Sequence, residues 1–389
     1  MKKKFPEYYR MTENELMEIW KNCIFIFDAN ILLSLYRYSE RTKNGLLNLM
    51  RKFFERIWLP HQSALEYNRN RFEVIAEQEK AHNEFIEKIK KIKDDVHSNN
   101  ALPFLTNPLE SELISVLDKV QSEVNSSKER YSFYLKEDPV YNTLSEIFKD
   151  KISESYTVDR EKEICKEGEE RYKLEIPPGY KDAKTKSGDR MYGDLILWKQ
   201  VIDKAKQEKK PILLITNDDK ADWWWKLKDG KTIGPRYELV KEIRNEAGVE
   251  FHMYSSENFL SHGQEFWNEP VDQIAVGEIQ AMKMTQLEEG KEKTLAELRA
   301  LQFDRRRRLN TIEVVLKNLS DNIYELENKK QNLQLAGMSP GEIPNEIQNL
   351  MTRKARLHDE RQLLIDEEKK LTLLSGDDVF LLSTRQKEF

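Results

Sequence analysis

Two short apolar runs that each lead into an aspartate constrain the fold of this chain more than any other feature. Residues 23–27 run directly into Asp28, and residues 211–215 are followed closely by Asp218. Short uninterrupted apolar runs are typical of strands that are buried on both faces of a parallel sheet. The carboxyl ends of parallel strands meet at one edge of the sheet, so we expect the two aspartates to lie together at that edge.

Strand-like and helical patterns alternate around these two runs. Further strands are expected at residues 56–59 and 249–254, and helices at residues 42–54, 194–207 and 235–247. This alternation predicts a three-layer α/β/α domain, in which helices cover both faces of a parallel sheet.

A long charged tract interrupts the predicted α/β domain. No convincing strand pattern occurs between residues 60 and 177, where helix-like sequence dominates. We therefore expect one domain over residues 1–268 that contains a helical insertion at about residues 68–176. Two expected strands precede this insertion and two follow it. We therefore expect strands from both sides of the insertion to form one sheet.

The remaining residues, 269–389, have the pattern of long helices that form a coiled coil. Leucine and isoleucine recur at alternating steps of three and four, and later every seven residues. A break rich in glycine and proline predicts that the two arms fold back as an antiparallel hairpin. Ser339 and Glu342 have the capping-box spacing around Pro340, which predicts that the second helix restarts there. We expect this helical hairpin to mediate homo-oligomerisation or to dock a protein partner.

Composition limits the class of protein. Charged residues make up 34% of the chain with a formal net charge of −5, so any contact with nucleic acid depends on local basic patches. Only two cysteines occur, which excludes a disulfide framework and a cysteine-rich zinc site. No stretch approaches the roughly 20 uncharged apolar residues of a membrane span. The sequence therefore predicts a cytoplasmic protein without a membrane partner.

Four acidic residues stand at the end of an apolar run or at the start of a predicted helix, namely Asp28, Glu66, Asp194 and Asp218. Magnesium and manganese prefer hard oxygen ligands, so convergent carboxylates at one sheet edge are a candidate site for Mg²⁺ or Mn²⁺. A metal held there neutralises a phosphate and activates a water, and the matching reaction is phosphodiester hydrolysis.

Four segments around these acids resemble the PIN-like nuclease domain, namely residues 27–33, 59–67, 192–198 and 216–220. The resemblance covers about residues 23–260 and is to the longer branch of the family, which carries a helical insertion. It implies that Asp28, Asp194 and Asp218 face the metal and that Glu66 completes the catalytic set.

The resemblance also implies supporting roles for neighbouring polar residues. Asn30 would orient Asp28, and either Thr216 or Asn217 would orient the loop after the last strand. Asp219 is an uncertain extra ligand, because successive residues at a strand edge point in different directions. Asp222 is an alternative cap for a helix expected at the Trp223–Trp224–Trp225 run.

Basic residues near the four motifs are candidates for holding the phosphates of a nucleic acid. They are Arg69, Arg71, Lys184, Lys186, Arg190 and Lys220.

We therefore expect a metal-dependent endonuclease that favours RNA. DNA as the substrate stays open, because discrimination through the 2′-hydroxyl leaves no readable pattern in the sequence. A catalytically inactive scaffold that acts in assembly is the alternative from another functional class. Nucleases of this kind with appended helices resemble bacterial toxins and antiviral defence effectors.

Overall fold

The computed structural model describes the backbone of residues 1–2, 4–97, 105–184 and 188–385. Side chains are described over the same ranges except at residues 97, 184, 189, 286–299 and 368–385. The chain divides into two compact units, Met1–Ala281 and Met282–Phe389.

A parallel sheet forms the centre of the first unit, and its four strands are ordered β2-β1-β3-β6. They span Ile57–Trp58 (β2), Ile24–Phe27 (β1), Ile212–Ile215 (β3) and Phe251–Tyr254 (β6). Each neighbouring pair is parallel. The structure confirms the four strands expected from the sequence and the α/β fold class.

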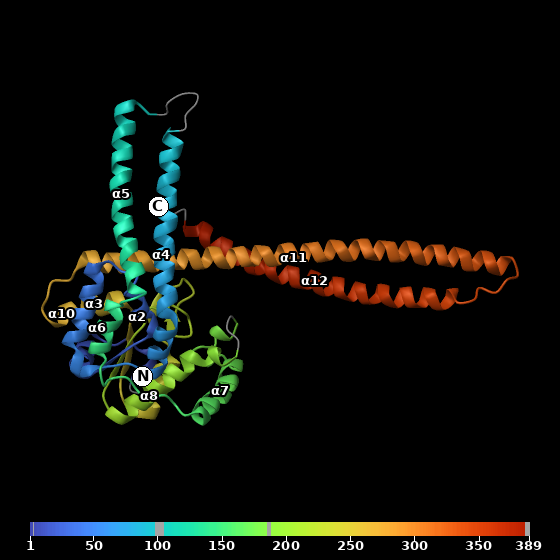
Figure 1. The fold of residues 1–389 in the computed structure, drawn as a ribbon. Helices are drawn as coiled ribbons and strands as arrows, with labels where there is room; N and C mark the ends of the chain where they lie inside the picture. The colour runs from blue at the N-terminus through green and yellow to red at the C-terminus, as the bar shows by residue number, and fades with distance from the viewer. Residues whose placement is uncertain (3, 98–104, 185–187, 386–389) are drawn as a thin grey trace. The chain divides into compact units, whose positions relative to one another are not determined.

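Helices surround this sheet and form the protruding parts of the first unit (Figure 1). In chain order they are α1 (Glu13–Asn22), α2 (Ala29–Ser34), α3 (Glu40–Lys52), α4 (His61–His97), α5 (Asn107–Tyr134), α6 (Pro139–Ile147), α7 (Val158–Lys173), α8 (Gly193–Glu208), α9 (Tyr237–Ala247) and α10 (Ser256–Phe266). Short 3₁₀ turns lie at Pro6–Tyr8, Phe54–Arg56, Asp182–Lys184 and Gly188–Tyr192.

The two faces of the sheet are covered by different helices, because successive strand residues point to opposite sides. Ile24 and Ile26 of β1 pack in one apolar cluster with residues of α8 and α9. Phe25 points to the other face, where its ring lies 5.1 Å from Trp20 of α1 and 5.9 Å from Phe259 of α10. The domain therefore has the predicted three layers.

Helices α4 and α5 form a long antiparallel pair within the tract expected to be an insertion (Figure 1). The Lys93 ammonium lies 2.6 Å from Asp118, and the Ser132 hydroxyl donates to Glu79 at 2.6 Å. This ion pair and this hydrogen bond between the two helices fix their antiparallel register. The expected boundary near residue 68 falls inside α4, which runs without interruption from His61 and so joins the sheet to the paired helices.

A small antiparallel hairpin was missed by the sequence interpretation. Trp224–Lys226 forms β4 and pairs with β5, Thr232–Pro235. The expectation of a helix at the tryptophan run is therefore wrong. Trp223 directly precedes β4, and Trp224 and Trp225 lie in the strand. Of the three tryptophans only Trp223 is fully buried, at 1% exposure.

The second unit is a helical hairpin formed by α11 and α12, which lie side by side in Figure 1. Helix α11 spans Gln273–Leu335, beginning in the first unit, and α12 spans Ile343–Arg385. Arg308 contacts Glu360 at 2.8 Å and Arg361 contacts Glu313 at 3.1 Å across the pair. The predicted antiparallel arrangement is confirmed.

The start of α12 differs from the predicted capping box. The helix begins at Ile343, and the Ser339 hydroxyl accepts the N–H of Gly341 at 3.4 Å. Glu342 instead supplies the first helical acceptor, since its carbonyl receives the N–H of Glu346 at 3.1 Å. The turn therefore occupies the residues that the sequence pattern assigned to the first helical turn.

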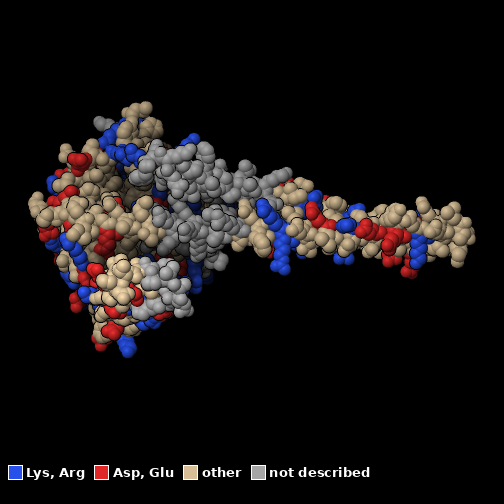
Figure 2. Space-filling view, turned by 90° about the horizontal axis from the view of Figure 1, so that it is seen from above, with Lys and Arg blue, Asp and Glu red and all other residues tan. Residues whose placement is uncertain are grey.

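Acidic and basic side chains are interspersed over the face of the molecule shown in Figure 2. In the helical hairpin this mixing includes ion pairs such as Arg305 with Glu367, at 3.2 Å. Among the residues that the structure describes, none of the helices has an apolar window of the length and hydropathy that a bilayer crossing requires.

Candidate active site

The carboxyl ends of β1 and β3 bring the first and last of the four acids to one edge of the sheet. Asp28 directly follows β1, and its N–H donates to the Ile215 carbonyl at 3.0 Å. Asp218 lies in the loop that leaves β3. Because Phe27 pairs with Ile215 in parallel register, the loops that carry the two aspartates begin side by side.

Two helices supply the other two acids. Glu66 lies on α4, and Asp194 lies in the first turn of α8. A Cβ atom on Gly193 would lie 2.8 Å from the Glu66 Oε1 atom, so the Glu66 carboxylate is packed against the start of α8. The Gln62 amide donates to the same oxygen at 2.5 Å and orients it.

A hydrogen-bond network orients the Asp28 carboxylate. The Asn30 amide and the Thr216 hydroxyl both donate to its Oδ2 atom, at 2.6 Å and 2.7 Å. The Asn217 N–H donates to Asn30 Oδ1 at 2.9 Å, and the Asp218 N–H donates to Thr216 Oγ1 at 3.0 Å. The polar residues after β1 and β3 therefore connect the two loops through direct hydrogen bonds.

Asp28 is electrostatically coupled to two of the other acids. Burial, then the Glu66 carboxylate and further the Asp218 carboxylate raise the pKa of Asp28 from 3.8 to about 7, although the Thr216 hydrogen bond opposes this rise. Such a shift means that the fold disfavours a negative charge at this position when no cation is present.

Asp194 belongs to the same electrostatic neighbourhood. Burial raises the pKa of Asp194 well above its ordinary value, and the carboxylates of Asp182, Asp218 and Asp28 act in the same direction against the opposing charge of Lys220. All four predicted acids are therefore linked, through Asp28, in one electrostatic neighbourhood.

Lys220 carries the positive charge closest to this group of acids among the contacts described. Its ammonium lies 2.6 Å from Asp182 Oδ1, 2.9 Å from Asp218 Oδ2 and 3.8 Å from Asp194 Oδ2. Burial acts to lower the pKa of Lys220, but the Asp194 and Asp218 carboxylates outweigh it and raise the pKa. The lysine is therefore held in its charged form against the carboxylates.

The carboxylate oxygen atoms of this site suit a hard divalent cation, although the described side chains do not form a complete coordination sphere. Within the described part of the chain, no three side chains of aspartate, glutamate, histidine or cysteine are grouped as a metal would require. The ammonium of Lys220 nevertheless marks a position where a cation is held by oxygen atoms of several carboxylates. Oxygen donors of this kind suit Mg²⁺ or Mn²⁺.

Asp222 does not cap a helix as expected, because the tryptophan run that follows it enters the strand β4. The residue is fully buried, and its Oδ2 atom accepts the N–H groups of Gly179 and Lys181, each at 3.1 Å. It therefore fixes the loop that precedes α8. Asp219 pairs with Lys226 of β4 at 2.8 Å, so its carboxylate is directed toward the hairpin.

The candidate phosphate-binding residues are in different surroundings. Arg69 and Arg190 are exposed. Arg71 donates to the buried Asp138 carboxylate at 3.0 Å and is only 16% exposed, so its guanidinium belongs to an internal network. Lys186 and the side chain of Lys184 lie outside the described residues.

Several residues that contact the four acids or Lys220 were not predicted as part of the site, and Gln62 beside Glu66 is one of them. Asp182 binds Lys220 as described above. The Trp223 indole donates to Asp194 Oδ2 at 3.3 Å, and the Trp224 indole donates to the Asp218 carbonyl at 2.6 Å. The only sequence signal for these roles was the nearness of an acid and two tryptophans to the predicted motifs.

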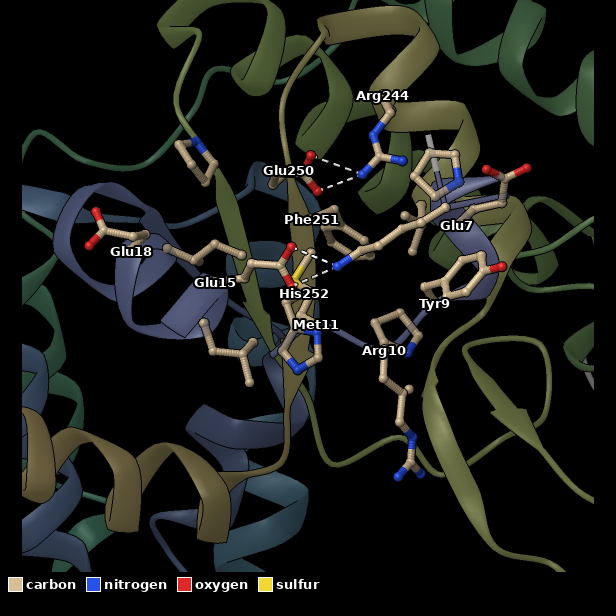
Figure 3. Close-up of a pocket in the computed structure, with 18 of the residues that line it drawn as sticks. Glu7, Tyr9, Arg10, Met11, Glu15, Glu18, Arg244, Glu250, Phe251 and His252 are labelled. Carbon is tan, nitrogen blue, oxygen red and sulfur yellow. Dashed lines mark hydrogen bonds and ion pairs between the residues drawn. The ribbon is translucent and has the colours of Figure 1, made fainter. Parts of the chain in front are cut away.

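The large cavity shown in Figure 3 is separate from the four acids. It has a volume of about 1170 Å³ and is lined by the N-terminal segment, β5 and the start of β6, including Met11, Ile233 and Phe251. An ion pair between Arg244 and Glu250, at 2.7 Å, is part of its lining. None of the four acids lines this cavity, so the candidate active site lies at the strand edge and not in the cavity.

Comparison with known families gives one match. The family model described as "PIN like domain" matches residues 24–239, which is more than half of the 389-residue chain. The matched segment runs from β1 into α9 and contains all four acids. Searches of curated proteins and of solved structures found no match.

Proposed function

Because the chain belongs to the PIN-like domain family, we propose that it is a nuclease that uses Mg²⁺ or Mn²⁺ to hydrolyse phosphodiester bonds. The observation that carries this proposal is the electrostatic coupling of Asp28, Glu66, Asp194 and Asp218 at one edge of the sheet. A bound divalent cation would neutralise the scissile phosphate and lower the pKa of a water at this edge.

The residues have separable roles in this proposal. Asp28, Asp194 and Asp218 would hold the metal, and Glu66 would complete the catalytic set from α4. Asn30 and Thr216 orient Asp28 through the hydrogen bonds described above. The raised pKa of Asp28 and of Asp194 supports metal binding, because a cation relieves the repulsion that disfavours their charged forms.

The proposed substrate is a polynucleotide that is cut internally, with RNA favoured over DNA. A site at the sheet edge suits an internal phosphodiester, since a polymer would be able to enter and leave along the surface. The exposed Arg69 and Arg190 would contact the phosphate backbone without reading its sequence. In the cell, action as a toxin or as an antiviral defence effector fits a nuclease of this family with an appended helical hairpin.

Substitution of single carboxylates tests this function. Asp28→Asn and Asp194→Asn are expected to lower cleavage of labelled RNA by about 100-fold or more, since even indirect partners of a metal typically change activity by 10–100-fold. Asp159→Asn on α7 is the matched control, because that side chain is 94% exposed. Full activity of the Asp28 variant, or cleavage that persists in excess chelator, would rule out the proposed chemistry.

The same assay decides the substrate. Matched single- and double-stranded RNA and DNA are incubated with the wild-type protein in Mg²⁺ and in Mn²⁺. Faster cleavage of DNA would support the proposed nuclease activity but would make DNA, and not RNA, the substrate. A folded wild-type protein that cuts none of the four polymers with either metal would favour the inactive scaffold.

A further inference from the structure

Lys220 occupies the charged position where several carboxylates converge. Its ammonium is within 2.9 Å of both Asp182 and Asp218, and it lies 3.8 Å from Asp194. The three carboxylate side chains are 4%, 13% and 18% exposed, whereas the lysine side chain is 39% exposed. A single positive charge on a partly exposed side chain therefore compensates acids that are themselves largely buried.

We propose that Lys220 is an internal counter-cation, which a divalent metal ion must displace from Asp194 and Asp218 before it can bind. This inference rests on the proposed function, because it concerns the same carboxylates. It assigns to the lysine a positioning and regulatory role that differs from contact with the phosphates of the substrate.

Electrostatics requires such a competition. A lysine ammonium and a divalent ion that bind the same oxygen atoms repel each other, so both cannot keep their full contacts. Only the end of the lysine has to move. The Lys220 backbone N–H donates to Asp218 Oδ1 at 2.8 Å, so the main chain is fixed, while the flexible and partly exposed side chain can swing.

Asp182 gives the displaced ammonium a place to remain. It makes the shortest of the three contacts, 2.6 Å, and it is not one of the four acids proposed for catalysis. Lys220 can therefore leave Asp218 and Asp194 while it keeps its pair with Asp182. Asp182 then favours metal binding indirectly, by holding the lysine away from the ligands.

Titration calorimetry with Mn²⁺ alone on the full chain tests the competition without an activity assay. Lys220→Met is expected to tighten Mn²⁺ binding by about tenfold or more, because it removes a positive charge that competes for the oxygen atoms of Asp194 and Asp218. Lys220→Gln is the second variant, since it keeps a hydrogen-bond donor for the carboxylates but removes the charge.

Lys206→Met is the matched control for these variants. Lys206 is 41% exposed and pairs with Glu246 at 2.5 Å, so it resembles Lys220 in exposure and pairing. It lies on the last turn of α8, away from Asp194 on the first turn. Its removal is expected to leave the Mn²⁺ affinity unchanged, and thermal melts without metal establish that each variant is folded.

A double-mutant cycle tests the role of Asp182. Asp182→Asn alone is expected to weaken Mn²⁺ binding severalfold, because the lysine is then held only by the proposed metal ligands. The same substitution in the Lys220→Met background is expected to have no effect on affinity. A loss of affinity of equal size in both backgrounds would overturn the indirect role, because it would show that Asp182 acts without Lys220.

The outcomes separate this inference from the proposed function. Wild-type binding of Mn²⁺ with tighter binding by both Lys220 variants supports the inference. Binding by a Lys220 variant when the wild type binds none also supports it, since displacement is then simply too costly in the wild type. Equal or weaker binding by the Lys220 variants overturns the inference and leaves the metal-dependent function standing. If no folded form binds Mn²⁺, both proposals fail.

Discussion

At the scale of single residues, the pKa of Asp28 links the candidate site to the stability of the fold. Burial, and after it the Glu66 and Asp218 carboxylates, raise this pKa from 3.8 to about 7. A carboxyl group with a higher pKa in the folded state favours folding while it is protonated. Its contribution is therefore fully present below pH 3.8 and is lost as the pH rises to about 7.

The corresponding prediction concerns the variant Asp28→Asn in metal-free buffer. Asparagine cannot ionise, so the variant escapes the loss of stability that the wild type suffers as the pH rises. Relative to the wild type, its free energy of unfolding is expected to increase between pH 4 and pH 8 by about 1–4 kcal/mol. Urea titrations in chelator at several pH values measure this difference. A difference that is constant with pH, as expected for the exposed control Asp159→Asn, would contradict the raised pKa.

Some of the site residues could be predicted from the sequence and others could not. Asp28 and Asp218 follow apolar runs, and strand ends in a parallel sheet share one edge, so their convergence was predictable. The contacts of Asp182 and Lys220 were not predictable. They depend on how two loops pack against each other, which hydrophobic patterning does not encode.

At the scale of elements, the sequence predicts the buried strands β1 and β3 but not the half-exposed strands β4 and β5. β1 and β3 are buried at every position, so they read as unbroken apolar runs. β4 is only partly buried along its length, and in β5 Thr232 is exposed while Ile233 and Gly234 are half-buried. Such short strands have no strong hydrophobic period, so the sequence pattern of the tryptophan run does not distinguish a strand from a helix.

The helical hairpin has a well-defined row of buried side chains, the seam, between α11 and α12, and we expect its stability to depend on them. Ile312, Leu316, Leu319 and Ile323 of α11 are each less than 9% exposed, whereas Val314 is 61% exposed. Ile323→Ala is expected to raise hydrogen-exchange rates of the hairpin amides roughly 10- to 30-fold, which corresponds to about 1.4–2 kcal/mol. Val314→Ala is the control and should leave the rates nearly unchanged. Equal protection in both variants would show that the seam does not hold the two helices together.

At the scale of the whole molecule, the first unit continues beyond the α/β sheet into the start of α11. Glu278 accepts hydrogen bonds from the Ser39 and Thr42 hydroxyls, each at 2.5 Å. Arg41 contacts Asp272 at 2.7 Å, and Ile279 is 3% exposed. The beginning of α11 is therefore part of the structural core of the first unit, although the sequence pattern of α11 is continuous with the coiled coil.

Two truncations test this division of the chain. A protein of residues 1–281 keeps the α3 contacts and is expected to retain the thermal stability of the first unit and its nuclease activity. A protein of residues 1–268 loses them and is expected to melt about 5–10 °C lower, from an estimated loss of ~2–3 kcal/mol. Equal melting temperatures would show that the start of α11 contributes nothing to the domain.

The oligomeric state of the same two proteins tests the proposed role of the hairpin. If α11 and α12 mediate self-association, the full chain is an oligomer and both truncated proteins are monomers, because the hairpin is absent from each. Light scattering coupled to size-exclusion chromatography measures the mass directly. An unchanged number of subunits after truncation would exclude self-association through the hairpin. A monomeric full chain would instead leave a different protein as its partner. Ile323 and the other seam residues already pack within the hairpin, so such a partner would bind exposed side chains such as Val314.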